Sequence, residues 1–335
     1  MSFCLYPAVG EPLFYTISLE PPELLPASIV TRLYDTDAEL KSFLTNDLNA
    51  RRLERVGYSV ESGRHALPAH TGEFPPYYTG YVADLLGERG VPGDLLAQQM
   101  NRKTPYEVEK VVAANQVAAH GLRVFFQSVR PGVTEVEVAG KVEAAIHGQT
   151  GQQGCKMARG WGFVQAGPNS ARAGSASRSS SYALQTGDLV VLEMATMVDG
   201  YWSDLTRTLV VGGQIAPAQQ ALMSAVREAQ TAALATVRAG VRHADVDRAA
   251  RSVLEQHGFG QNFIHHTGHH VGFRYHDHGP SLLGHVNEPL LAGNIITIEP
   301  GAYGHGIGGG CRFEENVLVT EEGYRVLSPY HLTGD

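Results

Sequence analysis

A short turn sequence occurs twice in this chain, 108 positions apart. Residues 129–133 read VRPGV and residues 237–241 read VRAGV, and an acidic residue and a valine follow each copy at the same distance. Each copy joins two helical patterns and is followed by strand-like sequence. An internal repeat of this period indicates two α+β halves related by pseudo-symmetry. Active sites commonly form where such halves meet.

The repeat covers the chain only from about residue 100 onward. Residues 104–107 read TPYE, which has the form of a helix start with a capping box and a proline at the first helical position. Residues 1–100 contain a strand-like run at 13–19 and a helical stretch around 37–56, but no motif that indicates chemistry. We therefore predict an α+β fold with a small N-terminal α/β domain at 1–100 and a repeat-containing domain at 101–335.

Composition and charge exclude several classes of function. A net charge of −8 without any Lys/Arg cluster makes nucleic acid an unlikely partner. No apolar run approaches the roughly 18 residues that span a bilayer, and the N-terminal sequence lacks the basic start of a signal peptide. Three scattered cysteines without CxxC spacing argue for a reducing compartment. We expect a cytoplasmic protein with neither nucleic acid nor membrane as partner.

The first half ends in a predicted β-hairpin that carries two carboxylates. Residues 199–200 read Asp-Gly between apolar runs, which is a strong signal for a two-residue turn. That turn pairs Ala195 with Asp204, so Glu193 lies on the same face as a diagonal neighbour of Asp204, about 7–8 Å away. Two carboxylates at this separation repel unless positive charge lies between them. The alternative is one buried carboxylate paired with Arg207 and one exposed carboxylate.

The second half repeats this arrangement of acids. Glu299 ends an apolar, β-prone run at 294–298, and Glu314 stands at the start of another such run. Glu299 follows Glu193 by 106 positions and Glu314 follows Asp204 by 110, which is close to the repeat offset. Two acidic pairs at the repeat offset indicate a shared function rather than chance.

A histidine-rich segment lies in the sequence between the acidic pair of the first half and the acidic pair of the second half. Residues 265–278 contain six histidines, more than a protein core usually needs. We expect His266, His270 and His278 to be structural or surface residues. An imidazole opposite four carboxylates, without sulfur, suits Mn²⁺, Co²⁺, Zn²⁺ or Fe²⁺. Two such ions about 3.5–4 Å apart can hold a hydroxide and stabilise a tetrahedral intermediate, which is the chemistry of a hydrolase.

Together these motifs resemble the prolidase, aminopeptidase P and creatinase family of pita-bread metallopeptidases. The segments that carry the resemblance are GDLVVLEMATMVDGYWSDLTRT, HHTGHHVGFRYHD, TIEPG and RFEENVLVT. They occur in the family's order and the match covers about residues 100–335. The resemblance implies a pita-bread catalytic domain with an internal pseudo-two-fold repeat.

The resemblance also implies a metal site and roles for its residues. Two divalent ions per chain are expected, Mn²⁺ first and Zn²⁺ or Co²⁺ as alternatives. Their ligands would be Glu193, Asp204, His269, Glu299 and Glu314, with Asp204 and Glu314 bridging the ions. Glu299 would also shuttle a proton between a metal-bridged hydroxide, the nucleophile, and the leaving amine. His265 and His276 would bind or polarise the scissile carbonyl, and Arg312 would orient ligands or the substrate terminus.

The activity implied is hydrolysis of an Xaa-Pro bond. Its leading form is cleavage of Xaa-Pro dipeptides, as in prolidase, by a homodimer or tetramer. Aminopeptidase P activity on longer peptides is the first alternative. A metal-free, creatinase-like amidinohydrolase is the second, and an inactive binding module is the third.

Several positions depart from the family pattern. Glu193 stands where the family has aspartate and is longer by one methylene, so we expect altered occupancy of the ion that it would hold. The others are Ala195 for glycine, Gly174 for histidine and His266 for glycine. The N-terminal domain is shorter than the family's usual one. The arginine that prolidases use for the dipeptide carboxylate is not evident, and Arg274 or His285 is a candidate substitute.

Overall fold

The computed structural model describes residues 3–18, 29–59, 76–93, 95–174 and 178–328. These residues fall into two compact units, one N-terminal to Ala97 and one from Ala97 onward. Within the described ranges, no helix combines the length and apolar character that crossing a membrane requires. The domain limits of 1–100 and 101–335 stay a prediction.

The N-terminal unit contains two small sheets and two helices. Its strands are β1 (Phe3–Leu5), β2 (Leu13–Ile17), β3 (Val30–Tyr34), β4 (Val56–Ser59) and β5 (Gly90–Gly93), and its helices are α1 (Asp37–Ala50), α2 (Pro76–Leu86) and the 3-10 turn η3 (Gly87–Arg89). Strand β2 lies between β1 and β3, while β4 pairs in parallel with β5. The predicted strand at 13–19 is confirmed as β2. The helix expected to reach about residue 56 instead ends at Ala50, because Arg52 adopts a φ of 55° and Val56 begins a strand.

The first half of the second unit places two helices against a three-stranded sheet. After α3 (Leu95–Asn101), which contains the boundary between the units, its elements are α4 (Pro105–Ser128), α5 (Glu135–His147), β6 (Ala158–Ala166), the 3-10 turn η4 (Gly167–Arg172), β7 (Leu189–Val198) and β8 (Tyr201–Val210). The sheet order is β6-β7-β8, antiparallel throughout. Thr104 and Thr134 each form a capping box with the glutamate three residues later, as the sequence predicted for both helix starts.

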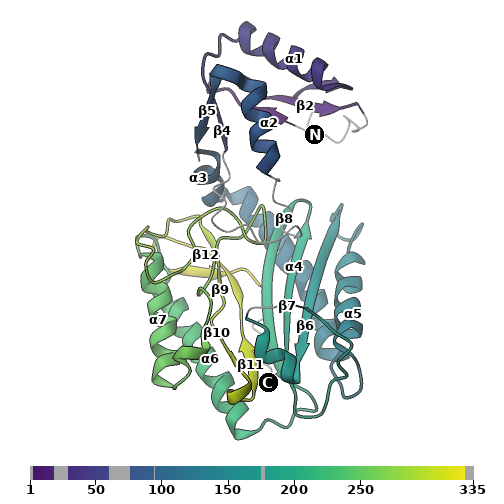
Figure 1. The fold of residues 1–335 in the computed structure, drawn as a ribbon, viewed down its shortest axis with the longest axis vertical. Helices are drawn as coiled ribbons and strands as arrows, with labels where there is room; N and C mark the ends of the chain where they lie inside the picture. The colour runs from purple at the N-terminus through teal and green to yellow at the C-terminus, as the bar shows by residue number, and fades with distance from the viewer. Residues whose placement is uncertain (1–2, 19–28, 60–75, 94, 175–177, 329–335) are drawn as a thin grey trace. The chain divides into compact units, whose positions relative to one another are not determined.

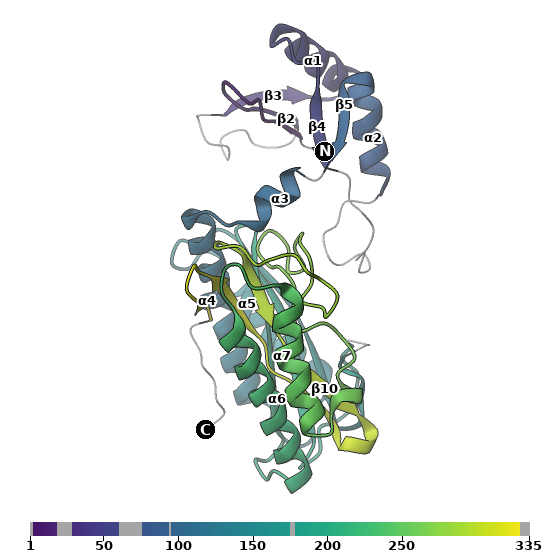
Figure 2. The same ribbon diagram turned by 90° about the vertical axis from the view of Figure 1, so that its left-hand side faces the viewer.

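The second half repeats the helix pair but carries shorter strands. Its elements are α6 (Pro217–Thr236), α7 (His243–Gln256), η5 (Gly260–Asn262), β9 (Ile295–Ile298), β10 (Gly301–Gly304), η6 (His305–Ile307), β11 (Gly309–Arg312), β12 (Glu315–Val319) and β13 (Tyr324–Val326). Strand β12 lies between β13 and β9, and β10 forms a separate hairpin with β11. Figure 2 shows α6 and α7 running side by side.

The predicted pseudo-symmetry is confirmed in the backbone. The two copies of the repeated turn join α4 to α5 and α6 to α7, and their glycines have nearly the same φ, 85° at Gly132 and 83° at Gly240. The Gly132 N–H donates to the carbonyl of Leu184, and the Gly240 N–H donates to the carbonyl of Leu290. Equivalent hydrogen bonds at the repeat offset show that the two halves share one backbone design.

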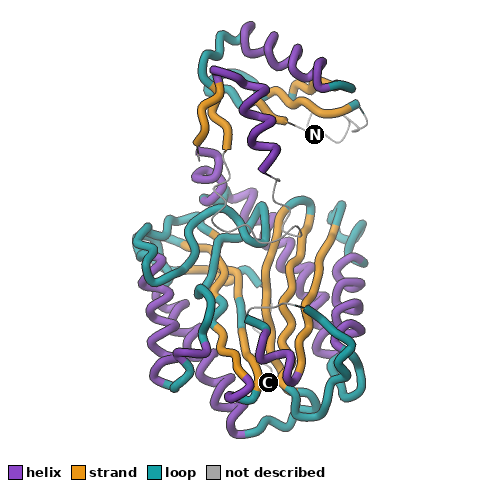
Figure 3. Tube along the Cα trace, viewed as in Figure 1, coloured by secondary structure: helices purple, strands orange, loops and turns teal. Residues whose placement is uncertain are grey.

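Each half has a hydrophobic core between its helices and its strands, and Leu189 and Val210 of the first half also contribute to the core of the second. In the first half, side chains of α4 and α5 pack on β6 and β7, and in the second half α6 and α7 pack on β9 to β12. Figure 3 shows the strands of both halves gathered between the flanking helices. The predicted α+β class is therefore correct, and the strands of the two halves come together where the acidic residues lie.

Candidate metal centre

The hairpin of β7 and β8 sets the position of the first acidic pair. The turn residues Asp199 and Gly200 have φ values of 50° and 92°, as a tight turn of mirror-image type requires. Ala195 pairs with Asp204, which confirms the predicted register, and Glu193 pairs with Thr206. Side chains at these four strand positions therefore share one face of the sheet.

In the second half the acids stand at strand ends and the histidine loop lies along β9. Glu299 directly follows β9, and Glu314 directly precedes β12. The Thr297 N–H donates to the His269 carbonyl at 2.8 Å, and the His269 N–H donates to Thr297 Oγ1 at 3.0 Å. A Cβ on Gly268 would lie 2.0 Å from the Thr297 carbonyl oxygen, so only glycine lets the loop approach this closely.

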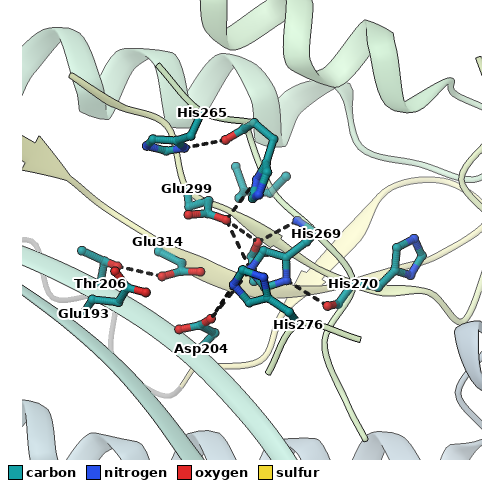
Figure 4. A network of polar contacts seen from close by, with 12 residues as sticks. Glu193, Asp204, Thr206, His265, His269, His270, His276, Glu299 and Glu314 are labelled. Atoms are coloured by element: carbon teal, nitrogen blue, oxygen red, sulfur yellow. Dashed lines mark hydrogen bonds and ion pairs between the residues drawn. The ribbon is translucent and has the colours of Figure 1, made fainter. Parts of the chain in front are cut away.

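Two overlapping sets of side chains bring their ligand atoms together. In the described part of the chain, these sets are Asp204 with His269 and His276, and His269 with Glu299 and Glu314, each within 4.8 Å. His269 Nε2 lies 3.3 Å from Glu299 Oε1 and 3.7 Å from Asp204 Oδ2. Figure 4 shows Asp204 from the first half and Glu299 from the second half facing the His269 and His276 rings.

The hydrogen bonds of His269 leave its Nε2 atom, which faces the carboxylates, available for a metal. His269 Nδ1 lies 2.9 Å from the His270 carbonyl oxygen, which can only accept, so Nδ1 carries the proton. Nε2 then keeps its lone pair and faces the carboxylates. A ligating histidine usually donates its second ring nitrogen to such a carbonyl, which fixes the ring's tautomer and direction.

Glu193 belongs to neither set among the described residues, and its carboxylate contacts Arg312 instead. Arg312 Nε also donates to Thr206 Oγ1 at 3.0 Å, and Thr206 Oγ1 donates to Glu314 Oε2 at 2.8 Å. The structure therefore joins Glu193 to Glu314 through one buried arginine and one hydroxyl. Sequence reasoning did not find Thr206, although it stands two residues after Asp204 and so shares its face.

His265 takes part in a network rather than facing the carboxylates directly. Its Nδ1 lies 2.7 Å from the His266 carbonyl, and its Nε2 lies 2.9 Å from the Tyr303 hydroxyl, which Arg312 Nη1 approaches at 2.8 Å. The Tyr303 ring occupies the space beside Gly174, where a Cβ would lie 2.6 Å from the ring. Tyr303 thus fills the space next to Gly174, which stands where the family pattern has a histidine.

The other loop histidines divide between the site and the core. His266 Nδ1 lies 3.5 Å from Glu299 Oε1, so this residue borders the site although we expected a replaceable one. His270 is buried, and its Nε2 lies 3.3 Å from Nε2 of His243, in keeping with a structural role.

Burial and mutual repulsion shift the pKa values of the clustered groups. Burial, followed by the charges of Glu314 and other acids, raises the pKa of Asp204 and that of Glu299 well above their usual range. Burial raises the pKa of Glu314 to about 7, although Arg312 opposes this shift. Burial also holds the pKa of His269 well below its usual range, with the neighbouring His276 adding to this. The site therefore combines a neutral imidazole with buried carboxyl groups whose negative charges the neighbouring cationic side chains do not balance.

One buried atom is in keeping with a cation at this site. Asp204 is 2% exposed, yet its Oδ1 atom has no hydrogen-bond partner. A buried carboxylate oxygen without a partner costs stability unless a cation or a proton meets it. Carboxylate oxygens with one imidazole nitrogen form a donor set that Mn²⁺, Zn²⁺ or Co²⁺ accepts. Donor chemistry and burial thus agree with a divalent metal.

Comparison with known proteins agrees with this geometry. The family model described as metallopeptidase family M24 matches residues 109–321. The chain is 32% identical to the Xaa-Pro dipeptidase of Lactobacillus helveticus over 226 residues, which are 68% of this chain and 59% of that protein. The chain spans about three fifths of the length of the curated relatives it matches.

Solved structures of peptidases show the same fold. The Xaa-Pro dipeptidase from Bacillus anthracis superposes with a TM-score of 0.79 at 25% identity, over 96% of this chain and 85% of that one. The X-Pro aminopeptidase from Thermotoga maritima MSB8 superposes with a TM-score of 0.78 at 25% identity, over 96% and 86%. The pita-bread fold expected from the motifs is therefore confirmed, and the chain belongs to metallopeptidase family M24.

Proposed function

We propose that this protein is a metal-dependent Xaa-Pro dipeptidase of the prolidase type. The observation that carries this proposal is the neutral His269 facing three buried carboxylates, one of which has an oxygen without a hydrogen-bond partner. The similar proteins of Lactobacillus helveticus and Bacillus anthracis, both named Xaa-Pro dipeptidase, support the same substrate class.

The metal would be held by side chains from both halves of the second unit. We assign two divalent ions, Mn²⁺ first and Zn²⁺ or Co²⁺ as alternatives, to Glu193, Asp204, His269, Glu299 and Glu314. When bound, such ions polarise a carbonyl and lower the pKa of water. Glu193 would need to share its carboxylate between an ion and Arg312.

Other steps fall to the chain's own residues. Thr297 Oγ1 donates to Glu299 Oε1 at 3.2 Å, which orients the carboxyl group that would carry a proton to the prolyl nitrogen as the peptide bond breaks. His276 stands against His269 with ring centroids 3.7 Å apart, and we assign it to the substrate carbonyl. We assign His265 to the same carbonyl through the Tyr303 network. Arg312 is 4% exposed and acts by orienting Glu193 and Thr206.

Elemental analysis combined with peptide turnover tests the proposal. We expect about two ions per chain, turnover of Xaa-Pro dipeptides, its loss after EDTA and its return with Mn²⁺. Glu299→Gln should abolish turnover, whereas Glu322→Gln, the same change at an exposed glutamate, should not. Turnover that survives EDTA in protein without metal would contradict the proposal and favour a creatinase-like amidinohydrolase.

Aminopeptidase P activity is a second candidate, because the Thermotoga maritima structure named X-Pro aminopeptidase is about as similar as the dipeptidase structure. Turnover of Xaa-Pro dipeptides and of matched Xaa-Pro-Yaa tripeptides separates the two. A higher kcat/KM for the tripeptides would replace the dipeptidase assignment.

Compartment and assembly are also proposals. We propose a cytoplasmic location, in keeping with the three free cysteines Cys4, Cys155 and Cys311. We further propose a homodimer without nucleic acid or membrane partners. Cell fractionation and light scattering after gel filtration test these two assignments.

A further inference from the structure

Strand β6 presents two different faces to its surroundings. Its sequence at residues 159–163 is RGWGF, so glycine alternates with aromatic residues. A Cβ on Gly160 would lie 2.9 Å from Ile146 of α5, and one on Gly162 would lie 3.5 Å from Val142. The glycines thus let α5 approach one face of β6, while Trp161 and Phe163 occupy the opposite face.

That opposite face is the one that carries the candidate metal centre. Trp161 pairs with Ala195, which pairs in turn with Asp204. Phe163 pairs with Glu193, which pairs in turn with Thr206. Because directly paired residues of antiparallel strands project to the same side, both rings share a face with the acids of β7 and β8.

Aromatic contacts continue from these rings to the metal centre. We call Trp161, Phe163, Trp202 and Tyr275 the aromatic wall. The Tyr275 ring lies edge-on to the Trp161 ring, with an interplanar angle of 86° and 5.0 Å between ring centroids. The centroid of the Trp202 ring lies 5.9 Å from that of Tyr275, and the centroid of Phe163 lies 4.6 Å from that of Trp161.

The wall ends at the histidines of the site. Tyr275 contacts His276 at 4.5 Å, and His276 contacts His269 at 3.7 Å, both between ring centroids. Tyr275 is buried, whereas Trp161, Phe163 and Trp202 are half-buried. Half-buried rings beside a reactive centre offer apolar area to a ligand that reaches that centre.

The carbonyl assigned to His276 fixes which part of a dipeptide would meet the wall. The scissile carbonyl belongs to the first residue of the dipeptide. The side chain of that residue is attached to the Cα next to this carbonyl. A first residue whose carbonyl lies at His276 therefore places its side chain close to Tyr275, which contacts His276 and belongs to the wall, an apolar surface on that side of the sheet.

We propose that the aromatic wall binds the side chain of the residue before proline, and that the substrates are Xaa-Pro dipeptides with an aromatic or large aliphatic first residue. This inference rests on the proposed function and names its substrate class. An apolar side chain that leaves water for such a surface gains binding free energy in proportion to the area buried. Glycine at the same position gains none.

Peptide series and wall variants test the inference. Wild-type kcat/KM should be about tenfold or more higher for Phe-Pro and Leu-Pro than for Gly-Pro. Trp161→Ala and Phe163→Ala should bring the Phe-Pro to Gly-Pro ratio toward one, and Trp161→Phe should retain most of it. Tyr324→Ala, which removes a ring from β13 outside the wall, should leave the ratio unchanged. Equal wild-type kcat/KM for Phe-Pro and Gly-Pro would overturn the proposal.

Two further outcomes are decisive. Loss of both activities at an unchanged ratio would show that the wall holds the proline ring or only supports the fold, and would also overturn it. If Trp161→Ala fails to fold, the milder Phe163→Leu change should still lower the Phe-Pro to Gly-Pro ratio of kcat/KM below that of the wild type. An unchanged ratio in that variant would overturn the proposal.

Intrinsic fluorescence separates this inference from the proposed function. The chain has two tryptophans, Trp161 and Trp202, and both belong to the wall. Phe-Pro should change their emission at concentrations about tenfold lower than Gly-Pro does. Tighter binding of Phe-Pro without turnover of any Xaa-Pro dipeptide would support the wall and overturn the proposed function. Turnover without a side-chain preference would overturn the wall alone.

Discussion

The two halves of the second unit place equivalent glutamates in different backbone settings. Glu193 and Glu299 stand 106 positions apart, close to the repeat offset. Glu193 lies in the middle of β7, a strand of 10 residues that is paired on both sides. Glu299 is the first residue after β9, a strand of 4 residues. One glutamate is thus held within a ladder, and the other stands at a strand end.

Their contacts differ accordingly. Glu193 contacts Arg312, a buried cation of the chain itself. Glu299 lies 3.3 Å from His269 Nε2, and Thr297 orients it. A duplicated backbone therefore supplies one glutamate that neutralises an internal arginine and one that faces the best candidate ligand nitrogen. The two carboxylates thus share a position in the repeat but have different partners.

The largest expected effect separates these two glutamates. Glu299→Gln should lower kcat by about 10²–10⁴, because it removes the proposed proton carrier. Glu193→Gln should instead lower the affinity for one of the two ions by at least about 10–100-fold, the loss that follows even when only a partner of a ligand is removed. Steady-state kinetics and metal titration measure the two quantities. Equal losses of kcat in both variants would show that the halves contribute alike.

A buried ion pair that joins the two halves should account for the next largest effect. Lys103, two residues before α4, meets Asp277 of the histidine loop at 3.0 Å, and both side chains are 0% exposed. Asp277 also accepts the N–H groups of Phe273 and His278, which frame His276. Lys103→Met leaves a buried carboxylate without its cation and should lower the free energy of unfolding by about 3–5 kcal/mol.

An exposed pair in the same unit provides the control for this change. Arg242 and Asp245 have side chains that are 49% and 28% exposed, so Arg242→Ala should cost about 1 kcal/mol or less. Urea unfolding of both variants measures the difference. Equal losses would show that the buried pair is no stronger a link between the halves than a surface pair.

The sequence predicted what local patterns encode. The Asp-Gly turn determined the pairing of Ala195 with Asp204, and the two capping boxes determined where α4 and α5 begin. Both signals lie within a few residues of the feature they predict. The repeated turn also predicted the two halves, because a duplication leaves the same local signal twice.

Partners that are distant in sequence could not be predicted in this way. Arg312 and Glu193 are 119 positions apart, and no periodicity or spacing relates them. Tyr303 fills the space beside Gly174 only because β10 crosses η4, which is a property of the folded chain. The end of α1 at Ala50 was missed for a local reason, since the apolar residues after it belong to a turn and to β4.

The acids of both halves should make the metal-free protein sensitive to pH. The pKa of Glu314 is raised from 4.5 to about 7 in the folded chain, first by burial. A raised folded-state pKa contributes stability that is complete below about 4.5 and is lost as pH rises through about 7. The free energy of unfolding of the metal-free protein should therefore fall by at most about 3 kcal/mol across this range, and its Tm should fall with it.

Bound metal should reverse that trend, because ligands bind in their deprotonated form. Thermal unfolding at pH 4.5, 6 and 7.5, once with EDTA and once with Mn²⁺, measures the pH dependence of the Tm without metal and with it. Glu314→Gln should flatten the curve recorded in EDTA. A metal-free Tm that rises between pH 4.5 and 7 would show that the carboxyl groups of the two halves do not repel one another.

The smallest expected effect concerns the helix starts, where the two halves also differ. Helices α4 and α5 begin at Thr104 and Thr134, each with a capping box, whereas α6 and α7 begin at Ala216 and Arg242 without a side-chain cap. Thr134→Ala should cost about 1 kcal/mol, and Ala216→Ser should add up to about 1 kcal/mol. Urea midpoints of the two variants measure these changes. If Ala216→Ser adds nothing while Thr134→Ala costs its full amount, packing rather than capping fixes the start of α6, and the halves differ in how their helices begin as well as in their acids.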